Sequence, residues 1–221
     1  MTTASRRDVQ RIKGLPQRII GVDPGTLITG WGAIEARGGT LTPLGHGTIA
    51  TAGAHGQGDR LSLIYRGLED VIRSYEPTGL SLERVFFARN AQSALKLGQA
   101  RGVALLAAAH GGLAVHEYAA SEIKLAVVGY GYATKAQVQK MVASLLHVSE
   151  KIAPDAADAL AAAICHLHRQ CFQSLILEAV PDWSSAIRRR RFSFGASQKA
   201  RWSDVKIRSV KKLKTDRDCA N

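Results

Sequence analysis

An aspartate interrupts the first apolar run of the chain and constrains how the fold begins. Residues 19–26 read IIGVDPGT. The apolar residues predict a short buried strand, and Pro24 with Gly25 predicts a sharp turn directly after Asp23. A carboxylate carried to the end of a buried strand is costly unless a cation compensates it. Asp23 is therefore the first candidate for a binding site.

Three further acids follow segments that can bring them to the same place. Glu83 ends a second strand-like run, whereas Asp155 and Asp158 open a helix and share one of its faces. Taken singly, each acid has an ordinary explanation, such as a helix start or a surface ion pair. Taken together, they predict an oxygen-rich site for Mg²⁺ or Mn²⁺. Two such ions can hold an attacking water and a leaving oxygen across a phosphodiester.

The apolar pattern predicts an α/β fold. Strands are expected at residues 19–23, 28–35, 40–50, 80–85 and 113–116, with a hairpin turn at 37–39. Helices are expected at residues 60–75, 91–109, 119–126, 134–147 and 155–179. Three strands followed by alternating helices and strands indicate one sheet with helices on both faces.

The positive charge is concentrated at the two ends of the chain. The 221 residues carry a net charge of +12. Residues 1–18 hold five Lys/Arg against one acid, residues 185–221 hold twelve against three, and the part between holds thirteen against fourteen. We expect a basic arm at 1–17, a globular domain at 18–180 and a disordered or fold-on-binding tail at 181–221. Both ends are typical of DNA contacts, although solvated tails that aid solubility are the alternative.

The chain has the features of a cytosolic protein. No uncharged apolar stretch approaches the roughly 20 residues of a membrane span. Three cysteines, Cys165, Cys171 and Cys219, fit no zinc pattern and indicate reduced thiols. The first eighteen residues are rich in Arg, Ser and Thr, which is also the composition of an organellar transit peptide. An organellar location therefore stays open.

Motifs that run in order along the chain extend the pattern beyond the four acids. They are GVDPG at 21–25, Glu83 followed by Phe86 and Asn90, SALKLGQARG at 93–102, EYA at 117–119, Lys124, VVG at 127–129, Lys135 with Gln137 and Val138, and DAADAL at 155–160. This set closely resembles the bacterial RuvC family of Holliday-junction resolvases over residues 18–170. The resemblance implies an RNase H-like fold with a five-stranded mixed sheet. It also implies a homodimer that cuts two opposed strands of a four-way DNA junction in recombination and repair, with 5′-phosphate products, beside a branch-migration helicase complex.

The resemblance also implies roles for individual residues. The metal-binding acids, two ions per site, are Asp23, Glu83, Asp155 and Asp158, and Lys135 joins them as a catalytic residue. The expected DNA-binding residues are Phe86, Arg89, Asn90, Lys124 and Lys135, with Phe86 stacking on bases near the branch point. The helix at 91–109, with Gly98 and Gly102, is the candidate dimer interface, and packing within one subunit is the alternative.

Three other functions are alternatives to junction cutting. A sugar kinase or actin-like protein also holds phosphate on a loop after its first strand, but it needs a second such domain, for which this chain is too short. A catalytically silent scaffold has no need of four clustered acids. A nuclease for other branched DNA or for RNA–DNA hybrids stays open, because the resemblance is loose at Tyr130 and Tyr132 and leaves the substrate preference undecided.

Overall fold

The computed structural model describes residues 16–84 and 91–179. The predicted tail and nearly all of the predicted N-terminal arm lie outside these residues. So do three of the predicted DNA contacts, Phe86, Arg89 and Asn90. The arms and these contacts therefore stay predictions.

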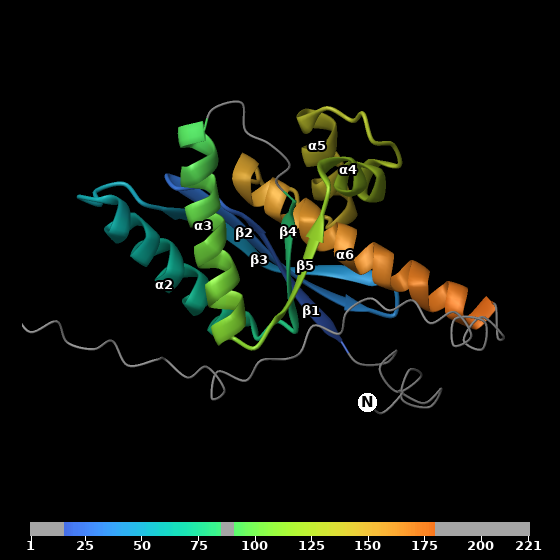
Figure 1. The fold of residues 1–221 in the computed structure, drawn as a ribbon. Coiled ribbons are helices and arrows are strands. Elements are labelled where there is room, and N and C mark those ends of the chain that lie inside the picture. Colours follow the sequence, from blue (N-terminus) through green and yellow to red (C-terminus); the bar gives the residue numbers. More distant parts are fainter. Residues whose placement is uncertain (1–15, 85–90, 180–221) are drawn as a thin grey trace, which may run out of the picture. The chain divides into compact units, whose positions relative to one another are not determined.

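The described residues contain one five-stranded mixed sheet (Figure 1). Its strands are β1 (Gln17–Asp23), β2 (Ile28–Arg37), β3 (Thr40–Ala50), β4 (Gly79–Glu83) and β5 (Ala114–Tyr118), in the order β3-β2-β1-β4-β5. The first three strands are antiparallel neighbours, whereas β4 is parallel to both β1 and β5. The predicted hairpin turn is present, because Gly38 and Gly39 adopt φ of 57° and 88°, a conformation that favours glycine.

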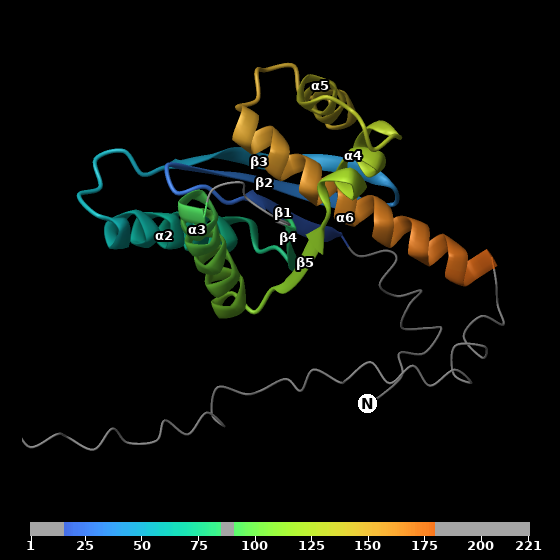
Figure 2. The same ribbon diagram turned by 45° about the horizontal axis from the view of Figure 1, so that its top comes forward.

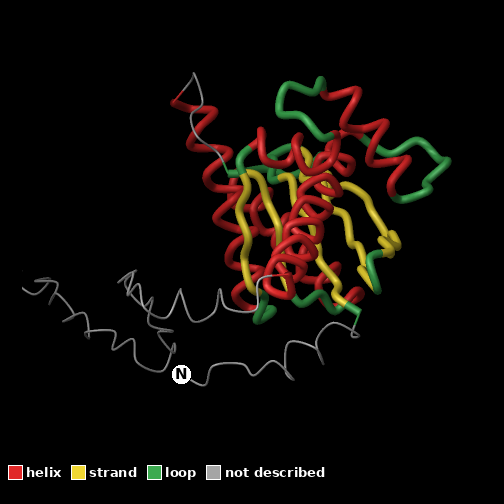
Figure 3. Tube along the Cα trace, turned by 90° about the vertical axis from the view of Figure 1, so that its right-hand side faces the viewer, coloured by secondary structure: helices red, strands yellow, loops and turns green. Residues whose placement is uncertain are grey.

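Helices cover both faces of this sheet, as predicted (Figures 2 and 3). They are α2 (Gln57–Tyr75), α3 (Ala91–His110), α4 (Ala120–Val128), α5 (Lys135–Leu145) and α6 (Pro154–Ala179). Side chains alternate along β1, so Ile19 packs into the core under α4, α5 and α6, while Ile20 packs into the core under α2 and α3. None of the described helices has both the length and the apolar character needed to cross a membrane.

Helix α6 lies unusually close to the strands beneath it. A Cβ atom on Gly21 would stand 1.8 Å from the Ala159 carbonyl oxygen, and one on Gly30 would stand 2.0 Å from that of Asp155. On the neighbouring strand, the Ser81 hydroxyl donates a 2.7 Å hydrogen bond to the Ala162 carbonyl oxygen. Glycine is required wherever two backbones touch. The beginning of α6 is thereby fixed over the ends of β1 and β4.

Candidate active site

Two of the four predicted acids lie side by side at one edge of the sheet. Strands β1 and β4 are parallel, and Val22 pairs with Leu82 in their register. Asp23 and Glu83 are the next residues on each strand, so both acids leave the sheet at the same carboxyl end. Ligand sites of open α/β sheets commonly form at such ends.

The other two acids reach this edge through α6. Asp23 pairs with Gly30 on β2, and Gly30 in turn contacts the main chain of Asp155. Asp158 follows on the same face of the helix, one turn later. The tight contact under α6 therefore sets where the helix acids stand relative to the strand acids.

The charges of these acids act on one another. Burial, followed by the negative charges of Asp158, Asp155 and Glu83, raises the pKa of Asp23 to about 6, while Lys135 opposes the shift. A carboxyl group among three others holds its proton more tightly, because each new negative charge is repelled. The four acids thus form one electrostatic group with an excess of negative charge.

Two lysines offset part of that charge. The Lys135 ammonium lies 2.5 Å from Asp158 Oδ2, and this hydrogen bond raises the lysine pKa. Lys135 is the first residue of α5, where the helix dipole disfavours a cation, so the nearby carboxylates account for its place there. Lys124 on α4 lowers the pKa of Glu83, whose pKa is raised first by burial and then by Asp158. Both predicted lysines therefore bear on the acid group.

The donor set suits a hard divalent cation, since carboxylate oxygens are the ligands that Mg²⁺ and Mn²⁺ prefer. The positive charge of such an ion would relieve the repulsion that raises the pKa of Asp23. As the side chains stand, however, no three His, Cys, Asp or Glu residues of the described chain are grouped closely enough to hold an ion. Asp158 is engaged by Lys135 instead.

Two residues outside the predicted site stabilise the backbone at Glu83 and just after Asp23. Arg101 on α3 donates a 2.7 Å hydrogen bond to the Glu83 carbonyl oxygen and also pairs with the carboxylate of Glu117 on β5. The buried Thr29 hydroxyl donates a 2.7 Å hydrogen bond to the Gly25 carbonyl oxygen, which secures the turn after Asp23. Arg101 lies inside the motif at 93–102, but only the fold reveals what it contacts.

Comparison with known proteins decides the family. Residues 19–166 match the family model described as crossover junction endodeoxyribonuclease RuvC. The chain belongs to the RuvC family. The match includes all four acids. The resemblance inferred from the sequence motifs is thereby confirmed.

Curated RuvC proteins are similar over nearly their whole length. The chain is 56% identical over 155 residues to RuvC of Syntrophotalea carbinolica, a match that covers 70% of this chain and 95% of the relative. It is 48% identical over 171 residues to RuvC of Pelobacter propionicus, covering 77% and 97%. The matches therefore cover nearly the whole of each relative and about three quarters of this chain.

Solved RuvC structures share the fold. The structure of Thermus thermophilus RuvC in complex with a Holliday junction substrate superposes with a TM-score of 0.68 at 29% identity, covering 72% of this chain and 97% of that one. The yeast mitochondrial Holliday junction resolvase Ydc2 has a TM-score of 0.54 at 9% identity, covering 77% and 88%, and supports the fold alone. The RNase H-like fold expected from the sequence is confirmed.

Proposed function

We propose that Asp23, Glu83, Asp155 and Asp158 hold the divalent ions with which this chain cuts four-way DNA junctions. Membership in the RuvC family makes the chain a junction-resolving endodeoxyribonuclease, in a family that depends on divalent metal ions. The observation that supports our assignment is the convergence of these acids at one sheet edge, where burial and neighbouring negative charge raise the pKa of Asp23 and of Glu83. Such repulsion is expected where a bound cation completes the site.

The residues around the acids have separate roles in this proposal. A pair of Mg²⁺ or Mn²⁺ ions held by the four acids would supply an activated water and offset charge on the leaving oxygen, and hydrolysis would give a 5′-phosphate and a 3′-hydroxyl. Asp158, which here contacts Lys135, would leave that contact to serve as one of the ligands. The freed Lys135 ammonium then stabilises negative charge on the phosphate, and Lys124 adds positive charge beside Glu83.

The test is cleavage of a synthetic mobile four-way junction and of a linear duplex, with Mg²⁺ and Mn²⁺ in separate reactions. We expect paired symmetric nicks in the junction and none in the duplex. Asp23→Asn should lower cutting by about a thousandfold or more while junction binding persists, because it removes a ligand and leaves the DNA-contacting surface. Asp70→Asn, an exposed acid of α2, is the matched control. Tight junction binding by the wild type without any nick would support the silent scaffold instead.

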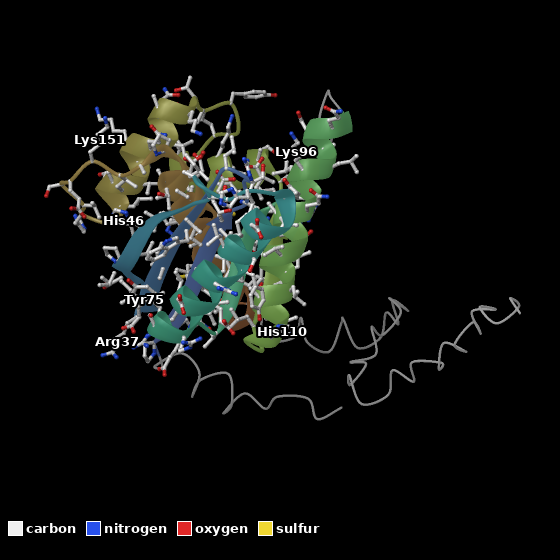
Figure 4. All side chains as sticks on the ribbon, turned by 90° about the vertical axis from the view of Figure 1, so that its left-hand side faces the viewer. Arg37, His46, Tyr75, Lys96, His110 and Lys151 are labelled. Carbon is white, nitrogen blue, oxygen red and sulfur yellow. The ribbon has the colours of Figure 1, made fainter. Side chains whose placement is uncertain are left out.

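A second copy of the chain is the partner we propose for α3. Leu95 and Leu106 on this helix are 69% and 42% exposed. Between them, Gly98 and Gly102 have no atom of the described residues, apart from the nearby backbone of α3 itself, within 4 Å of where a Cβ would lie. These four residues follow one another at helical spacing and face away from the core of their own chain. Figure 4 shows α3 along the outer side of the molecule, from Lys96 near its start to His110 at its end.

A symmetric dimer suits the substrate. A four-way junction has near two-fold symmetry, so a pair related by a two-fold axis presents equivalent sites to equivalent strands. Small residues on α3 would let the partner helix approach closely.

Beyond the domain at 18–180, we propose roles for the two arms, a helicase partner and a location in the cell. The arms at 1–17 and 181–221 add affinity for the DNA backbone, so their deletion should flatten the slope of log affinity against log salt. A branch-migration helicase complex acts with the dimer, which co-sedimentation on junction DNA can test. We assign the chain to the bacterial cytoplasm, and cell fractionation distinguishes this from an organelle.

A further inference from the structure

The loop between α4 and α5 carries two tyrosines with no role in the fold. Tyr132 is 97% exposed and Tyr130 is 43% exposed. The loop bends outward between the two helices (Figure 1). A large aromatic side chain usually buries most of its surface, so the exposed ring of Tyr132 leaves a large flat surface free to meet another molecule.

This loop is fixed at both ends. Gly129 adopts φ of 92° and closes α4, and its N–H donates a 2.9 Å hydrogen bond to the Leu125 carbonyl oxygen. Ala133, the neighbour of Tyr132, is 1% exposed and belongs to the core under α4, α5 and α6. Thr134 then caps α5. Because the backbone on either side is ordered, little conformational entropy is lost when the ring of Tyr132 meets a ligand.

The loop also joins the two lysines of the active site. Lys135 follows Tyr132 by three residues, and its ammonium lies 2.5 Å from Asp158. Three residues span at most about 10 Å, so the two backbones are no farther apart than that. Lys124 precedes the loop and acts on Glu83. With the length of the Lys135 side chain added, a DNA strand of about 3.4 Å per nucleotide that meets the acids would reach Tyr132 within roughly five nucleotides.

We propose that Tyr132 stacks on an unpaired base close to the cut phosphate, and that this contact helps set the sequence preference of cutting. The inference rests on the proposed function, because it takes junction DNA as the molecule that the acids engage. The charges of Lys124 and Lys135 favour a polyanion beside the ring over a protein surface. Stacking is open to every base, but its strength differs among them, which produces modest preferences without hydrogen-bond readout.

Base fluorescence tests this contact directly. The fluorescent base 2-aminopurine is placed in turn at each position within about five nucleotides of the cut phosphate. The full-length chain is then bound with Ca²⁺ in place of Mg²⁺. Stacking on the ring should quench one of these positions in the wild type and in Tyr132→Phe. Tyr132→Ala should lose that quenching and bind the junction about fivefold more weakly.

A matched control separates this contact from general effects. Phe172 on α6 is 64% exposed and lies fourteen residues, or roughly 21 Å of helix, beyond Asp158. In the complex with Phe172→Ala, 2-aminopurine fluorescence should be quenched as it is with the wild type. In a junction library with randomised bases around the cut, Tyr132→Ala should cut with a flatter base preference, and Tyr132→Phe should keep the wild-type preference.

The fluorescence and cleavage results distinguish a failure of the Tyr132 contact from a failure of the proposed function. Quenching and base preference unchanged in Tyr132→Ala would overturn the inference and leave the proposed function intact. A wild type that fails to cut junctions would contradict the proposed function instead, while the fluorescence of the bound junction would still decide the contact. An unchanged thermal midpoint of Tyr132→Ala confirms that the variant is folded.

Discussion

The ionised carboxylate of Asp23 lowers the stability of the folded chain, because it is buried among other acids. Its pKa rises from an ordinary value of 3.8 to about 6 through burial and three neighbouring acids. Between these two pH values the folded chain holds a proton that the unfolded chain has lost. The free energy of unfolding therefore falls as pH rises from about 4 to about 6, and the cost persists in full at higher pH.

We expect Asp23→Asn to be more stable than the wild type at pH 8, by about 1 to 3 kcal/mol, and to match it near pH 4. The neutral amide avoids both the burial of charge and the repulsion. Urea unfolding at the two pH values measures the difference. Added Mg²⁺ should stabilise the wild type selectively and narrow the gap, since it binds the folded state. Equal stabilities of the two proteins at pH 8 would show that the acid group carries no such cost.

Among the elements, α6 and the two strands beneath it determine the shape of the site. The chain places glycine at 21 and 30, where the helix backbone touches the sheet. The Asp155 main chain makes one of these contacts, so the position of this acid depends on the absence of a side chain at Gly30 on β2. Arg101 on α3 positions Glu83 in a different way, through its hydrogen bond to the Glu83 carbonyl oxygen.

Gly30→Ala should lower the free energy of unfolding by about 3 kcal/mol, because its Cβ would overlap the Asp155 carbonyl oxygen. Cutting per folded molecule should fall as well, since Asp155 has to move. Gly58→Ala is the control: its site is open and lies in α2, so alanine should change stability by less than about 1 kcal/mol, upward. Thermal unfolding and junction cleavage measured on both variants check the prediction. Comparable losses in the two would rule out the contact as the cause.

The elements also show what a sequence can reveal. Hydrophobic periodicity predicted the strands and helices, and the strand ends predicted that Asp23 and Glu83 would meet. Helix α2 begins at Gln57 rather than at residue 60, because Gly56 and Gly58 are weak helix formers and obscured its start. The contacts of Gly21 and Gly30 were not predictable, since contact between backbones leaves no side-chain pattern. The same holds for the pairing of Lys135 with Asp158, which depends on how α5 and α6 pack.

At the scale of the whole molecule, the distribution of charge bears on how the proposed dimer would bind a junction. The part of the chain between the two basic ends is nearly neutral. Two copies would bring four basic ends to a junction that has four duplex arms. Attraction to DNA and cutting of DNA would then be served by different parts of the chain.

Leu106→Glu should convert the dimer to a monomer, because it places a charge in the proposed α3 contact. Sedimentation analysis would detect the halved mass. Paired nicks should give way to single, uncoupled nicks. Leu63→Glu is matched in exposure, at 40% against 42%, but lies on α2 and should remain dimeric. Dissociation by both variants, or by neither, would remove α3 from the interface.

The backbone contact under α6 has a consequence for how the enzyme tolerates change. Main-chain atoms are far less compressible than a layer of side chains, and here they alone separate the helix from the strands at Gly21 and Gly30. The spacing between the strand acids and the helix acids is thus independent of how well either core is filled. Cavity-forming substitutions in the cores should erode the stability margin while the chemistry of the surviving folded molecules stays constant.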